Sequence, residues 1–161
     1  MAQKIWIFEL LIFFAIFYCP ITLAESIKGR AKIIDGDTIR IGKNKIRLYG
    51  IDAPEINQTC TINKIIWECG LDSSQALESM ISEKEVQCEI MDIDRYKRFV
   101  AKCFVKNINL NQYMVQNGWA IAYRYYSDDF INEEEIAEKN KAGIWQGKFQ
   151  DPYLFRKQQK N

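Results

Sequence analysis

Residues 29–55 read GRAKIIDGDTIRIGKNKIRLYGIDAPE, and this stretch decides the fold. Its apolar residues recur as they do in half-buried strands, and two turn signals, Asp35-Gly36 and Gly42-Lys43-Asn44, interrupt them. The pattern therefore predicts strands joined by tight turns. The apolar positions that carry it are Ile33, Ile34, Ile39, Ile41, Ile46, Leu48 and Ile51.

The same stretch gathers acidic residues around one arginine. Asp35 and Asp37 flank a glycine, Arg47 follows, and Asp52 and Glu55 end the stretch. Carboxylates held close together repel one another, so a positive group must lie among them. The arrangement predicts a divalent-metal site beside an anion-binding group. Asp35 is the exception, because Asp-Gly satisfies turn geometry by itself and favours a turn residue over a ligand.

Histidine is absent from the chain. This excludes Ser-His-Asp and Cys-His hydrolases, zinc enzymes of the HExxH type and nucleases that depend on histidine. A mechanism built on carboxylates, a metal ion and arginine remains. A phosphodiester is the substrate class that such a site suits.

The first 24 residues have the character of an export signal. Lys4 precedes an apolar run over residues 5–18, broken only by Glu9, and Thr22-Leu23-Ala24 offers small residues for cleavage. We expect residues 1–24 to be a cleaved signal peptide and residues 25–161 to form a single secreted or periplasmic domain. The alternative is an uncleaved anchor, but the run is shorter than the roughly 20 apolar residues that span a membrane.

Four cysteines follow the predicted signal, an even number that in an exported domain suggests two disulfides. Three connectivities are possible. If strands near residues 86–92 and 100–105 form a hairpin, Cys88 and Cys103 lie opposite each other, within reach of a disulfide. Cys60 and Cys69 would then close a short loop. A zinc site is the rival interpretation, but the spacing does not support it.

Three helices are expected after the first strands. Asp72-x-x-Gln75 resembles a capping box before an apolar stripe, residues 110–118 suggest a second helix, and residues 132–141 a third that buries Ile136 and Ala137. Hairpins interrupted by helices predict an α+β fold, compatible with a small closed Greek-key barrel. The net charge of +1 argues against nonspecific coating of nucleic acid.

Taken together, five segments resemble the staphylococcal nuclease (thermonuclease) family and follow that family's order. The resemblance implies a five-stranded OB-fold Greek-key β-barrel with about three packed α-helices. The segments are Ile34-Asp35-Gly36-Asp37-Thr38, Ile46-Arg47-Leu48, Gly50-Ile51-Asp52-Ala53-Pro54-Glu55, Asp94-Arg95-Tyr96-Lys97-Arg98 and Asn117-Gly118-Trp119-Ala120.

The resemblance also implies a role for each matching residue. Asp37, Asp52 and the backbone carbonyl of Ala53 would bind Ca²⁺, which prefers oxygen ligands. Glu55 would hold or activate the attacking water. Arg47 and Arg98 would clamp the phosphate, because the planar guanidinium meets two phosphate oxygens at once. From the residues alone, Arg47 could instead be a solvated strand residue, and Arg98 could pair with Asp92 or Asp94.

Four further residues are candidate substrate contacts. Tyr96, Tyr123 and Tyr125 could stack on a base, with Tyr126 a neighbouring alternative, and Lys97 adds positive charge. Lys97 occupies a position that is usually glycine in the family. If this position requires φ > 0, lysine costs roughly 1 kcal/mol.

The resemblance implies a Ca²⁺-dependent nuclease that hydrolyses DNA and RNA with little sequence preference and leaves 3′-phosphate ends. A monomer without stable membrane association after cleavage of the signal is expected. The alternative is a catalytically silent OB-fold module that binds nucleic acid or protein. A second rival is an exported calcium- or anion-binding protein without a nucleic-acid substrate.

Overall fold

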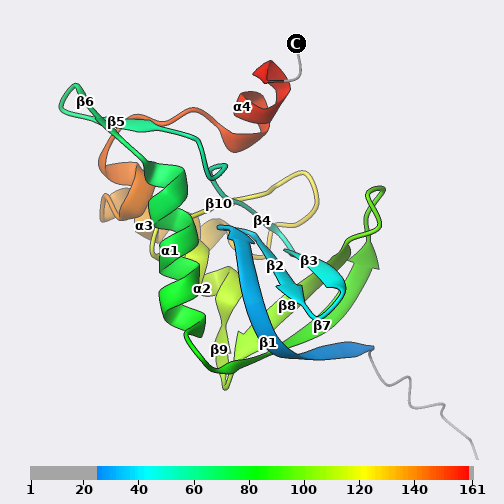
Figure 1. The fold of residues 1–161 in the computed structure, drawn as a ribbon. Helices are drawn as coiled ribbons and strands as arrows, with labels where there is room; N and C mark the ends of the chain where they lie inside the picture. Colours follow the sequence, from blue (N-terminus) through cyan, green and yellow to red (C-terminus); the bar gives the residue numbers. More distant parts are fainter. Residues whose placement is uncertain (1–24, 160–161) are drawn as a thin grey trace, which may run out of the picture.

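Residues 26–52 form consecutive short strands, as their apolar alternation predicts. The computed structural model describes residues 25–159 (Figure 1), so the predicted signal peptide, residues 1–24, lies outside the described residues. β1 (Ser26–Asp35), β2 (Thr38–Ile41) and β3 (Asn44–Leu48) pair antiparallel in sequence order. Ile39, Ile46 and Leu48 point inward and are fully buried.

A second hairpin completes the barrel. β7 (Glu85–Ile93) pairs with β1 and with β8 (Phe99–Val105), and the parallel pairing of β3 with β8 closes the sheet. β9 (Ile108–Asn109) pairs antiparallel with the end of β8 and forms the edge of the sheet. These pairings confirm the predicted α+β fold with a closed barrel of five strands.

Two short strand pairs lie outside the barrel sheet. β4 (Ile51–Asp52) pairs with β10 (Ile121–Ala122), and β5 (Cys60–Ile62) pairs with β6 (Ile65–Trp67). The disulfide Cys60–Cys69 ties the second pair to the following helix, and Cys88–Cys103 crosses β7 and β8 at directly opposed positions. Both predicted disulfides are present.

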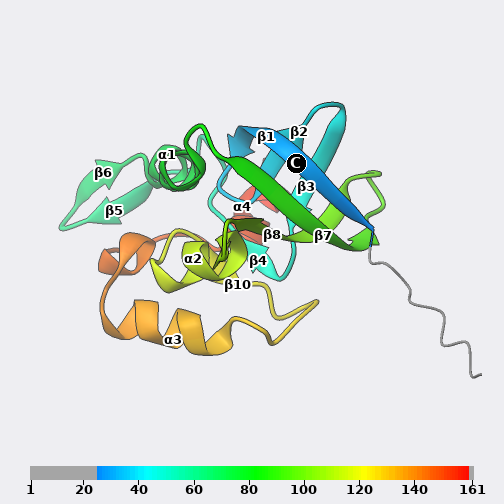
Figure 2. The ribbon, with the colours of Figure 1, turned by 90° about the horizontal axis from the view of Figure 1, so that it is seen from below.

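Helices cover one side of the barrel. α1 (Cys69–Ile81), α2 (Leu110–Gln116) and α3 (Ile131–Lys139) gather there, and the β5–β6 hairpin projects beyond α1 (Figure 2). A 3₁₀ turn, η1 (Gly143–Gln146), follows α3, and α4 (Pro152–Gln158) is a fourth helix that the sequence analysis did not predict. Within the described range, no helix is both long enough and apolar enough to cross a membrane.

Two local predictions about the helices were wrong. α1 begins at Cys69, before the proposed capping box, and Asp72 accepts a hydrogen bond from the indole of Trp67 instead of capping the helix. In α3, Ala137 is buried as predicted, but Ile136 is 47% exposed. Glu134 turns inward in its place, because its carboxylate accepts the backbone N–H of Ala122 at 2.9 Å.

Asn111 joins α2 to the closure of the barrel. This fully buried side chain donates to the carbonyl oxygens of Tyr49 (2.8 Å) and Ala101 (3.1 Å), and it accepts the N–H of Cys103 at 3.0 Å. A buried amide is stable in a core only when its hydrogen bonds are made. The three bonds of Asn111 therefore fix the segment after β3 against β8.

Candidate active site

The turn between β1 and β2 places Asp37 inside the protein. Asp35 accepts the backbone N–H of Asp37 at 3.0 Å, which is the turn role expected for it. A Cβ added to Gly36 would lie 2.0 Å from Ser73 Oγ and 2.8 Å from the Cβ of Ala53, so only glycine fits this close approach. The turn therefore presses against Ala53 and directs Asp37 toward β4.

Arg47 joins the two central carboxylates. Its Nη1 donates to Asp37 Oδ1 at 2.9 Å and its Nη2 donates to Asp52 Oδ1 at 2.6 Å. Both carboxylates are buried, with Asp37 3% exposed and Asp52 0% exposed. The strand register explains the contact between Arg47 and Asp37, because Arg47 lies opposite Thr38 on β2, and Thr38 follows Asp37. Arg47 is therefore a cation between two buried anions, not a solvated strand residue.

Further hydrogen bonds orient Asp37. Thr38 Oγ1 donates to Oδ1 at 2.8 Å, and the backbone N–H of Ala53 donates to Oδ2 at 3.1 Å. Ala53, predicted to offer its carbonyl to a metal, thus contacts Asp37 directly through its N–H. These bonds hold the Asp37 carboxylate in one orientation next to Ala53, and Arg47 joins it to Asp52.

A second arginine enters this cluster from α4. Arg156 Nη1 lies 2.9 Å from Asp52 Oδ1 and 3.0 Å from Glu55 Oε1, and its Nη2 lies 2.8 Å from Asp52 Oδ2. Arg156 therefore brings Glu55 into contact with the same group of side chains. Three of the predicted site residues, Asp37, Asp52 and Glu55, converge on two guanidinium groups.

The electrostatics of the acidic residues differ from one to the next. Burial raises the pKa of Asp35 to about 7, and the nearby charge of Asp37 adds to the rise. Burial alone would also raise the pKa of Asp37, but the charge of Arg47 together with the hydrogen bonds from Thr38 and Ala53 holds that pKa below its usual value. Burial raises the pKa of Asp52, although hydrogen bonds from Arg156 oppose this. Desolvation is thus a large cost at this site, and Arg47 and Arg156 offset only part of it.

The donor set fits a hard divalent cation. Two carboxylates and a neighbouring backbone carbonyl offer only oxygen atoms, the ligands that Ca²⁺ prefers. The two carboxylates already bind positively charged groups in the structure. Over residues 25–159, no group of three His, Cys, Asp or Glu side chains is arranged to hold a metal. Asp37 and Asp52 alone would thus give a cation few ligands from the described residues.

Arg98 lies apart from this hydrogen-bonded cluster. Its Nε donates to Asp94 Oδ2 at 2.7 Å, and its guanidinium carbon lies 5.6 Å from the centroid of the Tyr96 ring. In the described part of the chain, its ion pair is with Asp94. Lys97 has φ = 61°, the left-handed conformation suspected from the sequence. The catalytic role of Arg98 and the substrate contacts of Tyr96 and Lys97 stay predictions.

Three tyrosines form a cluster after β10. The ring centroid of Tyr123 lies 6.2 Å from that of Tyr125 and 5.3 Å from that of Tyr126. The guanidinium carbon of Arg47 lies 6.0 Å from the Tyr123 ring, which places this cluster beside the carboxylates. Tyr125 is 80% exposed and could stack on a base.

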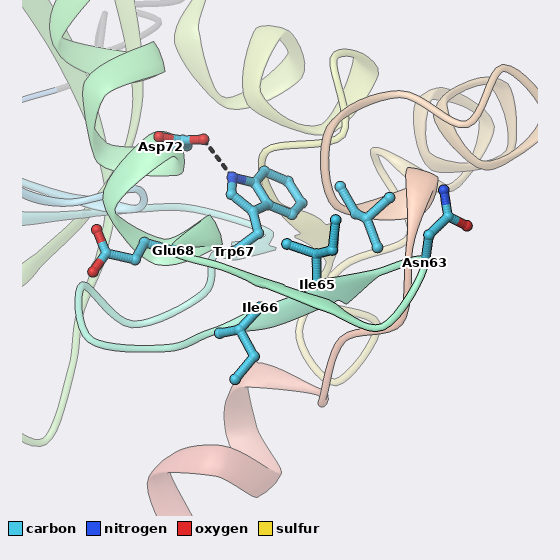
Figure 3. Close-up of a pocket in the computed structure, with 7 residues that line it drawn as sticks. Asn63, Ile65, Ile66, Trp67, Glu68 and Asp72 are labelled. Carbon is cyan, nitrogen blue, oxygen red and sulfur yellow. Dashed lines mark hydrogen bonds between the residues drawn. The ribbon is translucent and has the colours of Figure 1, made fainter.

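A separate hollow lies against the β5–β6 hairpin. It has a volume of about 550 Å³, and Ile65, Trp67 and Asp72 are among its lining residues (Figure 3). The indole of Trp67 points toward Asp72 and donates a hydrogen bond to it. This contact fixes the hairpin to α1. The residues that line the hollow are not those of the carboxylate cluster, so the two lie apart.

Two residues of the site region were not predicted from the sequence. Arg156 pairs with Asp52 across 104 positions, and Gln58 hydrogen-bonds with the backbone of Gln150 across 92. Asp151-Pro152 was a readable signal for α4, because Asp151 caps the helix and proline favours the first helical position. Asp151-Pro152 predicts where a helix starts, but it does not predict that Arg156 contacts Asp52.

The fold and the site define an α+β OB-barrel protein with a buried carboxylate–arginine cluster. Residues 45–147 match the model of the family described as "Staphylococcal nuclease homologue". The chain therefore belongs to this family.

Three relatives illustrate the range of similar proteins. The chain is 35% identical to the succinoglycan biosynthesis protein ExoI of Rhizobium meliloti (strain 1021), over 76% of this chain but 66%, just under two thirds, of that protein. It is 32% identical to an uncharacterized endonuclease of Escherichia coli O157:H7, over 81% and 84% of the two chains. It is 31% identical to a micrococcal nuclease of Shigella flexneri, over 81% and 80%.

Proposed function

We propose that the protein is a nuclease, a Ca²⁺-dependent phosphodiesterase that hydrolyses DNA and RNA with little sequence preference and leaves 3′-phosphate ends. One observation carries the proposal: Arg47 joins buried Asp37 and Asp52, and Glu55 adjoins the same cluster. Two relatives named as nucleases support it.

Metal binding, proton transfer and phosphate binding are assigned to different residues of the chain. Asp37, Asp52 and the carbonyl of Ala53 would hold the cation, which when bound supplies Lewis-acid polarisation of a phosphate oxygen. Glu55 accepts a proton from the attacking water. Arg47 and Arg98 donate hydrogen bonds to phosphate oxygens, whose negative charge grows as the water attacks.

The tyrosine cluster and the loop before β8 are the proposed substrate contacts. Tyr123 and Tyr125 would stack on bases, which is a sequence-tolerant interaction because every base has an aromatic face. Tyr96 and Lys97 would meet the substrate beside Arg98. Contacts of this kind favour broad specificity for DNA and RNA.

Export is the proposed cellular context. Residues 1–24 would be a cleaved signal peptide, and residues 25–161 a single monomeric domain in the periplasm or the medium. The disulfides Cys60–Cys69 and Cys88–Cys103 support this, because such bonds persist mainly in oxidising compartments.

A catalytically silent OB-fold module is the second candidate. The observation that favours it is the pairing of Arg156 with Asp52 and Glu55, which would silence the site if it were permanent. In that case the protein would bind nucleic acid or protein without cleaving it.

A digestion assay distinguishes the two candidates. Plasmid DNA, single-stranded DNA and RNA are incubated with the purified protein in calcium, in magnesium or in EDTA, and the product ends are identified by phosphatase sensitivity. The nuclease proposal expects cleavage in calcium that EDTA abolishes. Binding without cleavage under every condition would favour the silent module.

A further inference from the structure

Arg156 covers the side chain that is proposed to bind the cation. Asp52 Oδ1 accepts hydrogen bonds from Arg47 and Arg156, and Asp52 Oδ2 accepts one from Arg156. The Asp52 side chain has no exposed surface, whereas that of Arg156 is 28% exposed. A cation that approaches Asp52 from solvent must therefore displace this guanidinium.

The balance of charges also indicates that a cation at this site must displace Arg156. Asp37, Asp52 and Glu55 carry three negative charges when ionised, and Arg47 and Arg156 carry two positive charges. A Ca²⁺ ion added to this set would leave an excess positive charge beside the buried carboxylates of Asp37 and Asp52, which is costly. A Ca²⁺ ion that replaces Arg156 leaves the cluster neutral.

The position of α4 does not depend on Arg156 alone. Gln58 Nε2 donates to the carbonyl of Gln150 at 2.6 Å, Asp151 caps the helix at Leu154, and Pro152 is buried. The bond from Gln58 and the burial of Pro152 hold the start of α4 against the protein without Arg156. The Arg156 side chain can therefore leave Asp52 while α4 stays in place.

We infer that Arg156 is a built-in competitor of the divalent cation, an autoinhibitory contact that holds Asp52 and Glu55 closed until the metal displaces it. This inference rests on the proposed function for the identity of the cation site. The inference adds that α4, through Arg156, sets the cation concentration at which Asp52 and Glu55 become free to bind the metal. Arg156 makes three hydrogen bonds to these carboxylates. The cation concentration needed is therefore higher than it would be for the same ligands without Arg156.

Calcium titration by calorimetry tests the inference. The wild-type protein, Arg156→Gln, Arg156→Lys and Lys157→Gln are compared at one ionic strength, with calcium up to about 10 mM, above the affinities typical of extracellular modules. Arg156→Gln should bind calcium about tenfold more tightly than the wild type. Lys157 is exposed on the same helix, so Lys157→Gln matches the change in charge and should bind as the wild type does.

Arg156→Lys separates competition from simple charge. Lysine keeps the positive charge but loses the planar fork, so tighter binding of about threefold is expected. Equal or weaker binding by both Arg156 variants would overturn the inference, whatever their nuclease activity. Tighter binding without any cleavage would support the inference and reject the nuclease proposal. No calcium binding by any variant would overturn both.

Discussion

The side-chain nitrogen of Gln58 donates a hydrogen bond to the backbone carbonyl of Gln150, with 2.6 Å between the two atoms. The Oε1 atom of the same amide accepts the N–H of Glu55 at 3.2 Å. Gln58 is 1% exposed, so both bonds are shielded from water. One buried side chain thus connects the loop of Glu55 to the segment that precedes α4.

Gln58→Ala should lower the free energy of unfolding by about 2 kcal/mol, because two backbone groups lose their partner. Urea denaturation measures the loss, and hydrogen exchange should show weaker protection at residues 150–158. Gln75→Ala on the exposed face of α1 is the control, expected within about 0.5 kcal/mol of the wild type. Unchanged protection at residues 150–158 would show that Gln58 does not hold α4.

Glu55→Ala should reduce kcat by about 100-fold or more, because a positioned base contributes this much to proton transfer. The folded state should change little, since Glu55 is partly exposed. Steady-state cleavage of single-stranded DNA in saturating calcium gives the rates. The control is Glu68→Ala, an exposed acidic residue outside the cluster. A Glu55→Ala enzyme with a near-normal kcat would remove Glu55 from the mechanism.

Arg47→Ala should lower the cleavage rate by about 100-fold or more, because it removes a charged hydrogen-bond donor to the phosphate. The melting temperature should also fall, since Asp37 and Asp52 lose the cation that joins them. Arg40→Ala on the exposed face of β2 should change neither quantity appreciably. A variant that melts earlier but cleaves at the normal rate would make Arg47 purely structural.

The sequence predicted the parts of the protein that depend on local periodicity. Ile39, Ile46 and Leu48 alternate with polar residues, so their strands and their inward direction follow from the pattern. Cys88 and Cys103 are equidistant from the turn between them, which gives their register. Arg47 reaches Asp37 because it lies opposite Thr38 in the β2–β3 pair, and Asp52 follows Arg47 closely along the chain, on β4.

The misses depend on contacts that no local pattern encodes. α4 has only seven residues, and its apolar residues are consecutive instead of spaced at a helical period, so it lacks a periodic signal. Its arginine meets Asp52 across 104 positions. Ile136 was predicted to be buried because it is apolar, yet Glu134 takes the inward position by accepting the N–H of Ala122. Tertiary hydrogen bonds outweighed the apolar pattern in α3.

Lys97→Gly should stabilise the protein by roughly 0.5–1 kcal/mol, because lysine at φ = 61° carries a steric cost that glycine avoids. The gain is partial, since glycine also adds entropy to the unfolded chain. Thermal unfolding measures the difference. Arg95→Gly in the same loop, where φ is not positive, should give no gain. Equal effects of the two substitutions would mean that the backbone at Lys97 is not strained.

Asp94→Asn should destabilise the hairpin between β7 and β8 at neutral pH by about 1–2 kcal/mol. Asp94 accepts hydrogen bonds from the backbone N–H groups of Tyr96 and Arg98, each at 2.9 Å, and from Arg98 Nε. Burial alone would raise the pKa of Asp94, but the hydrogen bonds from Arg98 and Tyr96 and the charge of Arg98 together hold that pKa below its usual 3.8.

A carboxyl whose pKa is lower in the folded state stabilises the protein above its unfolded pKa and loses this effect as the pH falls through the folded value. The difference in unfolding free energy between the wild type and Asp94→Asn should therefore be full at pH 7 and shrink below about pH 4. Urea denaturation of both proteins at several pH values measures it. Asp92→Asn, an exposed neighbour on β7, serves as the control. A difference that stays constant down to pH 2 would show that the charge of Asp94 has no part in holding the loop of Arg98.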